Sequence, residues 1–454
     1  MFEKLISILA KTDGDYADLR YEIKRETWIT FDGKELASIG SGTTDGYVLR
    51  ILKDGGFSSI SFTRETDGDR AIRIAQGDAS IISKNRKDPV RLAGADVIQD
   101  MSFPDLEEDP REITMEEKLD LTRNYNNIPL QNQKVVSTNI SYREVIRNKY
   151  FMTTEGTRIR EDLITTSIGG IITVKSGNSI QSVRCGLGGS NGFKDLRNGE
   201  DEFEKRTSLA VRLLDAKPVE SGLYSVLLNP RLAGIFTHEA FGHFSEADLI
   251  EDLPTMREKM RIGNMLGSDL LSIKDDPTLP GQLGFYKYDD EGVRARPTQL
   301  MKNGALTGRL HSRRTAASFD EPLTGHCVAE DSRYAPIIRM GTIFIEPGKK
   351  SPEELLEDLN DGYYFLDSKG GQTSGENFTF GAQYGYRVQK GKVRELVRDI
   401  NLSGNLYETL QNTHGIGIDL QLSKIGGCGK GQMNMRSCFG APHILIKNVV
   451  VGGI

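Results

Sequence analysis

The chain has 454 residues, with 58 lysines and arginines against 64 aspartates and glutamates, which gives a net charge of −6 at pH 7. This length excludes a single small module, because a domain usually contains about 100–200 residues. No block of basic residues could neutralise a row of phosphates, so we expect no direct binding to nucleic acid.

The first part of the chain has the pattern of an α+β unit. Apolar residues at helical spacing predict a short helix over 1–11, and alternation over 17–31 predicts a strand. The Asp32-Gly33 pair that follows is a hairpin signal. Residues 84–111 are polar with little periodicity, which indicates a connecting loop. We therefore place a first domain at 1–110.

The middle of the chain is predicted to be rich in strands. Thr114 and Glu117 fit a capping box, which predicts a helix that begins there and continues to about residue 125. Residues 135–190 alternate between apolar and polar, with a turn expected at Ile168-Gly169-Gly170. This segment forms a second region at 111–217.

The last part, 218–454, returns to strands and turns, with one helix expected at 352–360. An apolar strand ends at Asn229-Pro230, where an N-cap residue precedes a proline suited to a first helical turn, so a helix should begin at Pro230. The 49 glycines, scattered between apolar segments, favour many tight turns and hence antiparallel sheets.

This helix carries the segment His238-Glu239-Ala240-Phe241-Gly242-His243. Two histidines that flank a glutamate on a helix are typical of zinc metalloproteases, but the spacing here is one residue longer than usual. Residues five apart on an α-helix differ by about 140° and do not face together. For both imidazoles to meet one ion, the helix must end, unwind or contain a π-type bulge near Gly242. The alternative to a metal site is that His238 and His243 are separate polar residues at the end of a packed helix.

A catalytic zinc needs three protein ligands, and a third is missing from this segment. The nearby acids Glu246 and Asp248, or a distant cysteine or histidine, could supply it. Cys428 lies among glycines in Gly426–Gly431, where the backbone could approach an ion closely, and is preferred over Cys438. Spacing alone leaves these alternatives open.

The cellular setting is expected to be the cytoplasm. Four cysteines in so long a chain are too few for a disulfide framework, which fits a reducing compartment. The N-terminus has an apolar stretch too short for a signal peptide, and no run of residues approaches the ~18 apolar residues of a membrane helix. We therefore expect no membrane association.

The sequence resembles the TldD/PmbA family, whose members are also called modulators of DNA gyrase. The resemblance covers almost the whole chain and is carried by DYADLRYE, NPRLAGIFTHEAFGHFSEAD, YDDEGVRARPTQLMKNGALTGRLHSRRTA, IRMGTIFIEPGKKSPEELL, GCGKGQ and APHILIKNVVVGGI. It implies a zinc-dependent peptidase of the TldD branch. In that comparison His238, His243 and Cys428 match the family's zinc ligands, and Glu239 matches its catalytic glutamate, the general base.

The resemblance also implies a fold and a substrate. The expected fold is an N-terminal α+β region followed by a C-terminal domain of strongly curved antiparallel β-sheets. The expected substrate is an unfolded peptide, bound in extended form as an added strand, so that specificity is loose. Dimers are implied, either homodimers or heterodimers with a PmbA-like subunit. The main alternative is a non-catalytic scaffold or regulatory subunit with a structural metal site.

Overall fold

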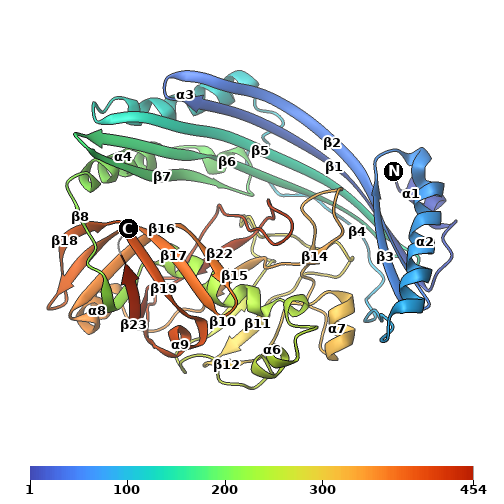
Figure 1. The fold of residues 1–454 in the computed structure, drawn as a ribbon. Helices are drawn as coiled ribbons and strands as arrows, with labels where there is room; N and C mark the ends of the chain where they lie inside the picture. Colours follow the sequence, from blue (N-terminus) through green and yellow to red (C-terminus); the bar gives the residue numbers. More distant parts are fainter. Residues whose placement is uncertain (453–454) are drawn as a thin grey trace.

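The computed structural model describes residues 1–452, which form an arched sheet above a C-terminal part (Figure 1). The arch has seven strands in the order β3-β2-β1-β5-β6-β4, with β7 paired to β6. All neighbours are antiparallel except β4 and β6. Its strands are β1 (Tyr16–Asp32), β2 (Glu35–Lys53), β3 (Gly56–Phe62), β4 (Gln99–Ser102), β5 (Val135–Thr153), β6 (Arg158–Ser176) and β7 (Ser179–Gly189).

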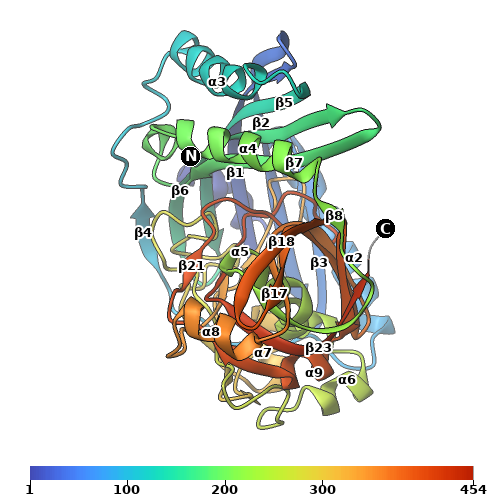
Figure 2. The same ribbon diagram turned by 90° about the vertical axis from the view of Figure 1, so that its left-hand side faces the viewer.

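Four helices accompany the arch. Helices α3 and α4 pack on each other, α3 on β5 and α4 on β7, and α3 lies near the top of the molecule in Figure 2. Helix α2 packs on β2 and β3 at the other end of the arch. The bounds are α1 (Phe2–Leu9), α2 (Gly68–Asn85), α3 (Met115–Leu130) and α4 (Glu200–Leu213).

The predicted turn at residues 168–170 is wrong, because β6 continues through it. The reason is a close approach of neighbouring strands. A Cβ atom on Gly169 would lie 2.5 Å from the carbonyl oxygen of Cys185 in β7, and one on Gly170 would lie 1.7 Å from that of Asn139 in β5. These glycines mark tight strand contacts instead of a turn.

The sequence predicted one helix of this part too short and did not predict another. Thr114 caps α3 by accepting a hydrogen bond from the amide of Glu117, which is one half of the predicted capping box, whereas the Glu117 carboxylate pairs with Arg197. The helix extends to Leu130 instead of residue 125. Helix α2 was not predicted at all, and most of the side chains on its buried face are alanines. A small face is needed there, because a Cβ on Gly56 of β3 would lie 1.9 Å from the carbonyl oxygen of Ala79.

The C-terminal part contains two larger sheets and one two-stranded sheet. Its helix at 352–360 is confirmed as α8, while α6, α7 and α9 are additional. One sheet consists of β12 (Ala305–Leu306), β11 (Thr298–Lys302), β10 (Ile273–Asp275), β15 (Thr342–Ile345), β22 (Cys438–Ala441) and β21 (Gln421–Leu422), and β13 (Cys327–Val328) pairs with β14 (Ile337–Ile338). The helices are α5 (Pro230–Phe236), α6 (Pro254–Lys259), α7 (Arg313–Phe319), α8 (Pro352–Leu359) and α9 (Leu406–Gln411).

The other large sheet curls until it closes. Strand β16 pairs with both β9 and β17, so β16, β9, β23, β19 and β17 form a ring. Helix α5 lies between β16 of the ring and β22 of the six-stranded sheet. The strands of this second sheet are β8 (Lys217–Pro218), β9 (Gly222–Leu228), β16 (Gly362–Ser374), β17 (Asn377–Gln389), β18 (Lys392–Arg398), β19 (Ile400–Asn405), β20 (Thr413–Ile416) and β23 (Ile444–Gly452). The predicted fold, an N-terminal α+β region followed by strongly curved, mainly antiparallel sheets, is confirmed.

Buried ion pairs fasten the arch to the C-terminal part. Arg50 of β2 lies 2.6 Å from Asp18 of β1 and 2.8 Å from Glu291, which belongs to a C-terminal loop. In the same way Asp290 lies 3.0 Å from both Arg20 and Lys149. Because an unpaired buried charge is costly, these pairs fix the position of the loop under the arch.

Among residues 1–452, no helix is long and apolar enough to cross a membrane.

Candidate metal centre

Helix α5 begins as the sequence predicts and then changes its winding. The side chain of Asn229 accepts a hydrogen bond from the amide of Leu232 at 3.0 Å, and Pro230 occupies the first turn. After Phe236 the chain continues as a π-helix over Thr237–Gly242. A π-helix bonds residues five apart, so it brings His238 and His243 toward a common side. The predicted departure from α-helical winding near Gly242 is confirmed.

Gly242 is needed for close packing beneath this turn. A Cβ atom there would lie 2.1 Å from the sulfur of Met340, which is fully buried, and 3.1 Å from Ile343. We expect Gly242→Ala to destabilise the fold by about 1–3 kcal/mol through overpacking, and to displace His243. Chemical denaturation together with metal analysis checks this. Gly263→Ala is the control. At φ +95° an alanine strains the backbone, but its Cβ atom would have nothing within 4 Å, so this variant tests the backbone effect without overpacking. Equal metal loss in both variants would contradict the packing argument.

Cys428 comes from a loop that is held in place by a small hairpin of its own and by hydrogen bonds to Glu330. The backbones of Cys428 and Met435 exchange hydrogen bonds of 3.2 and 3.1 Å, which forms a small hairpin. The carboxylate of Glu330 accepts from the amide of Met433 at 2.8 Å and from the Asn434 side chain at 2.9 Å. Gln432 accepts from the amide of Glu330 at 2.8 Å. These contacts fix the loop over the π-helix.

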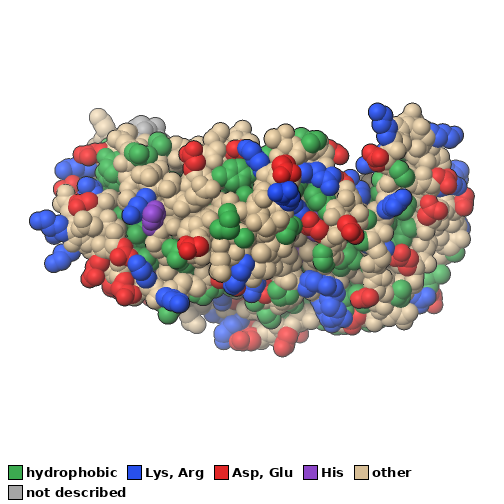
Figure 3. Space-filling model, turned by 90° about the horizontal axis from the view of Figure 1, so that it is seen from below, with side chains coloured by type: hydrophobic (Ala, Val, Ile, Leu, Met, Phe, Trp, Pro, Cys, Tyr) green, Lys and Arg blue, Asp and Glu red, His purple; other side chains and the backbone are tan. Residues whose placement is uncertain are grey.

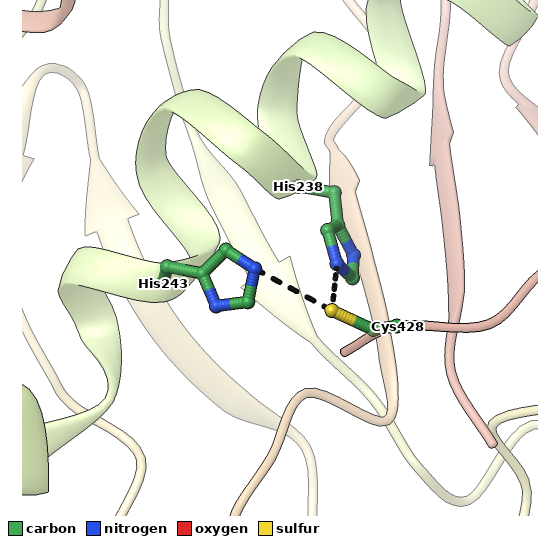
Figure 4. A group of neighbouring side chains, drawn as sticks. All are labelled: His238, His243 and Cys428. Carbon is green, nitrogen blue, oxygen red and sulfur yellow. Dashed lines mark hydrogen bonds between the residues drawn. The ribbon is translucent and has the colours of Figure 1, made fainter. Parts of the chain in front are cut away.

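The structure brings His238, His243 and Cys428 together, although 185 residues separate the second histidine from the cysteine (Figure 4). The Cys428 sulfur lies 2.9 Å from His238 Nε2 and 3.4 Å from His243 Nε2. The donor atoms of all three residues lie within 4.8 Å of one another. His238 and Cys428 are buried and His243 is half-buried. The arrangement is a candidate metal site with two nitrogens and one sulfur as donors.

Electrostatic interactions stabilise the ionised form of the Cys428 thiol and the protonated form of His243. Burial raises the pKa of the Cys428 thiol, but the two histidines more than offset this and bring the pKa to about 5. Burial lowers the pKa of His243, whereas its hydrogen bonds to Cys428 and Glu246 raise it to about 10. The cysteine is therefore a thiolate at neutral pH, the form that binds metals, whereas His243 must lose its proton when it binds one.

A layer of charged residues surrounds the donors. The buried carboxylate of Glu246 lies 3.3 Å from Nδ1 of His243. This is the ring nitrogen that does not face the Cys428 sulfur. Lys430 lies 2.8 Å from Glu246 and 2.9 Å from Asp248. Burial opposes ionisation of Glu246, but His243, Lys430 and Arg339 together lower its pKa to about 2. A carboxylate that orients a metal-binding histidine in this way is common. Nδ1 of His238 has no hydrogen-bond partner among residues 1–452.

The alternatives left open by the sequence occupy other places. Glu246 contacts the outer nitrogen of His243, and Asp248 contacts Lys430, so neither belongs to the three-donor group. Cys438 lies in β22, and burial raises its pKa to about 11. Sequence reasoning missed Lys430 and Arg339. Lys430 stands two residues after Cys428, but nothing in the sequence shows that it reaches Glu246.

Glu239 stands beside the donors without joining them. Its Oε2 lies 4.0 Å from His243 Nε2, and its side chain is 24% exposed, whereas that of Glu246 is fully buried. Its backbone carbonyl accepts a hydrogen bond of 2.8 Å from Thr373 of β16. Burial raises the pKa of its carboxyl group. The carboxylate thus lies beside the candidate metal site, and Glu239 also lines an opening in the surface.

That opening is a pocket of about 690 Å³. Its lining includes His243, Cys428 and Glu239 on one side, with the tip of the β16–β17 hairpin and the segment after the π-helix as the other walls. The pocket gives a molecule from outside access to the candidate metal site. Such a combination of an open cavity and convergent polar groups is typical of an active site.

Comparison with known proteins identifies relatives over the whole length. Sequence models described as PmbA/TldA metallopeptidase domain 1, central domain and C-terminal domain match residues 17–79, 108–216 and 221–453. A protein of Synechocystis sp. named as a metalloprotease is 34% identical over 98% of this chain and 96% of its own length. A protein of Saccharolobus solfataricus named "Zinc metalloprotease TldD homolog" is 30% identical over 99% of both chains.

Solved structures share the fold at lower identity. A putative modulator of a DNA gyrase from Thermotoga maritima superposes with a TM-score of 0.80 at 20% identity, over 99% of both chains. TldE from Thermococcus kodakarensis superposes with a TM-score of 0.79 at 18% identity, over 100% of both chains. The domain matches and the full-length relatives lead to one conclusion: the chain belongs to the TldD/PmbA family.

Proposed function

We propose that this protein is a zinc-dependent peptidase that hydrolyses unfolded peptides. The observation that carries the proposal is the convergence of His238, His243 and Cys428 beside Glu239, at the wall of an open pocket. Relatives named as metalloproteases support it. The zinc would be held by His238, His243 and Cys428.

The donor set fits zinc. Zinc binds imidazole nitrogen at about 2.0–2.1 Å and thiolate sulfur at about 2.3 Å, so donors around one ion lie roughly 3–4 Å apart. The distance of 3.4 Å between the Cys428 sulfur and His243 Nε2 is of this size, and the distance of 2.9 Å to His238 Nε2 is slightly shorter. Bound there, zinc supplies a Lewis acid that lowers the pKa of a water molecule and polarises a peptide carbonyl.

Glu239 is assigned to proton transfer. Its carboxylate takes a proton from the attacking water as general base and then donates it to the nitrogen of the departing amine. The 24% exposure of its side chain, in the wall of the pocket, leaves it accessible to both water and substrate. Glu246, which holds Nδ1 of His243, keeps that imidazole in place.

The scaffold alternative requires a structural metal site. Structural zinc sites are normally closed by four protein ligands and need no base. Here the group of donors among the described residues contains three side chains, and an additional carboxylate and a pocket lie beside it. These features favour catalysis over a purely structural role.

The extended form of the substrate is supported by the edge of β16. Only three residues of β16, Tyr363–Phe365, pair with strand β9. Residues 371–373, further along β16, line the pocket. Within the described chain, no strand pairs with that stretch of β16 on the side opposite β17. A peptide could therefore add there as a strand and bind through its main chain.

A native protein should resist cleavage while its unfolded form is degraded. Presenting an extended strand from a native domain would draw on much of its ~5–15 kcal/mol of stability, whereas an unfolded chain loses only conformational entropy. The experiment incubates one disulfide-bonded protein, native or permanently unfolded by reduction and alkylation, with the zinc-loaded enzyme. Cleavage of only the unfolded form is expected. Equal rates would contradict the requirement for an extended substrate.

The remaining assignments concern the setting of the enzyme. We propose a cytoplasmic protein with three parts at 1–110, 111–217 and 218–454, acting as a homodimer or as a heterodimer with a PmbA-like subunit. Direct binding to nucleic acid or to a membrane is not part of the proposal. On the face in Figure 3, basic and acidic side chains are interspersed, which does not favour a polyanion. Light scattering of the purified protein, alone and with a PmbA-like subunit, tests the assembly.

A further inference from the structure

One wall of the pocket beside the candidate metal site is apolar. It is built from the residues that directly follow the π-helix, namely Phe244, Leu249, Ile250, Leu253 and Met256. Leu249 is 42% exposed and Leu253 is 52% exposed. Phe244 and Met256 pack against the main core of the C-terminal part from this side. Two leucines are therefore held open to solvent on a wall that the core supports from behind.

Four glycines also line the pocket. Gly371 and Gly375 come from the β16–β17 hairpin, and Gly427 and Gly429 come from the cysteine loop. At Gly429 a Cβ atom would have its nearest neighbour at 3.7 Å, an ordinary contact, so the surrounding packing does not require glycine there. The absence of a side chain at Gly429 leaves space next to Cys428 in the same pocket.

The charges that line the pocket are already compensated, apart from Glu239. Lys430 is paired with Glu246 and Asp248, and Glu376 is paired with Lys259. His243 contacts Cys428 and Glu246. Among the lining side chains, within the described part of the chain, no lysine or arginine is left unpaired to attract an acidic side chain, and the nearby carboxylate of Glu239 would repel one.

We propose that this pocket binds a large apolar side chain of the peptide substrate, on a residue close to the bond that is cleaved. The inference rests on the proposed peptidase function and adds one side-chain preference to binding that is otherwise through the main chain. Burial of an apolar side chain against Leu249 and Leu253 removes both from water. A difference of one methylene in an apolar pocket changes the rate about tenfold or more.

The test uses short peptides of glycine, serine and alanine with one variable residue, moved along the sequence. With the zinc-loaded protein, peptides that carry leucine or phenylalanine near the cleaved bond should be hydrolysed at least about tenfold faster than those with aspartate. Leu253→Asp should abolish this preference. Aspartate is favourable at the position of Leu253, the N-cap of α6, so folding should tolerate the change. Leu270→Asp, at a leucine that is 50% exposed outside the pocket, is the matched control and should keep the preference.

Two readouts separate this inference from the proposed function. Cleavage of all peptides at equal rates would contradict the apolar pocket and leave the peptidase intact. No cleavage at all would contradict the proposed function. The pocket is then judged from the affinity of the same peptides, labelled with a fluorophore, for the Glu239→Gln protein by fluorescence polarisation. Equal affinity for the leucine and aspartate peptides would overturn the inference, and tighter binding of leucine peptides that Leu253→Asp removes would support it.

Discussion

Glu239→Gln is expected to abolish peptide hydrolysis while leaving the bound zinc and the fold unchanged. The substitution keeps the shape of the side chain but removes the group that accepts and returns the proton. General acid and base groups contribute about 10²–10⁴-fold to a rate, so a loss of this size is expected. Initial rates on an unfolded peptide pool, together with the zinc content and thermal unfolding of both proteins, measure the three quantities.

The position of Glu239 explains why the zinc should remain. Its Oε2 lies 4.0 Å from His243 Nε2, and it is not one of the three donors. Glu376→Gln, at another glutamate that lines the same pocket, is the matched control and should retain most activity. If the rate of Glu239→Gln stayed within a factor of about two of the rate of the unaltered enzyme, the assignment of Glu239 as general base would be wrong. The scaffold alternative predicts that the unaltered protein and Glu239→Gln bind the same amount of zinc and that neither hydrolyses peptides.

Cys428→Ala is expected to remove most of the zinc and, with it, the activity. Alanine leaves two imidazoles as donors and takes away the one negatively charged ligand, whose pKa of about 5 makes it a thiolate at neutral pH. Three protein ligands are the usual minimum for a catalytic zinc site. Elemental analysis of the purified protein measures the metal, and circular dichroism shows whether the fold is retained.

Cys438→Ala provides the comparison, because it removes a buried thiol of the same size at another place. Burial raises the pKa of Cys438 to about 11, and it lies in β22 outside the donor group. It should therefore keep its zinc, with at most a small loss of stability from the missing sulfur. The same zinc content in the two variants would mean that Cys428 is not a ligand.

Local features of the chain were predicted where the signal is local. The start of α5 at Asn229-Pro230, the cap of α3 at Thr114 and helix α8 follow from residues that act on their immediate neighbours. The need for a non-α turn near Gly242 follows from helical geometry alone. The sequence failed at Gly169 and Gly170, because a glycine required by a neighbouring strand looks the same as a glycine required by a turn.

The sequence by itself determined that His238, Glu239 and His243 share one helix, and the resemblance to a family suggested Cys428 as their partner. Only the tertiary structure decided where the sulfur lies, since the loop that carries it is positioned by Glu330, a residue from another part of the chain that bonds to Gln432 and Met433 of the loop. The same holds for Lys430 and for the apolar wall at Leu253. These contacts depend on packing between segments far apart in the sequence, and no local propensity encodes them.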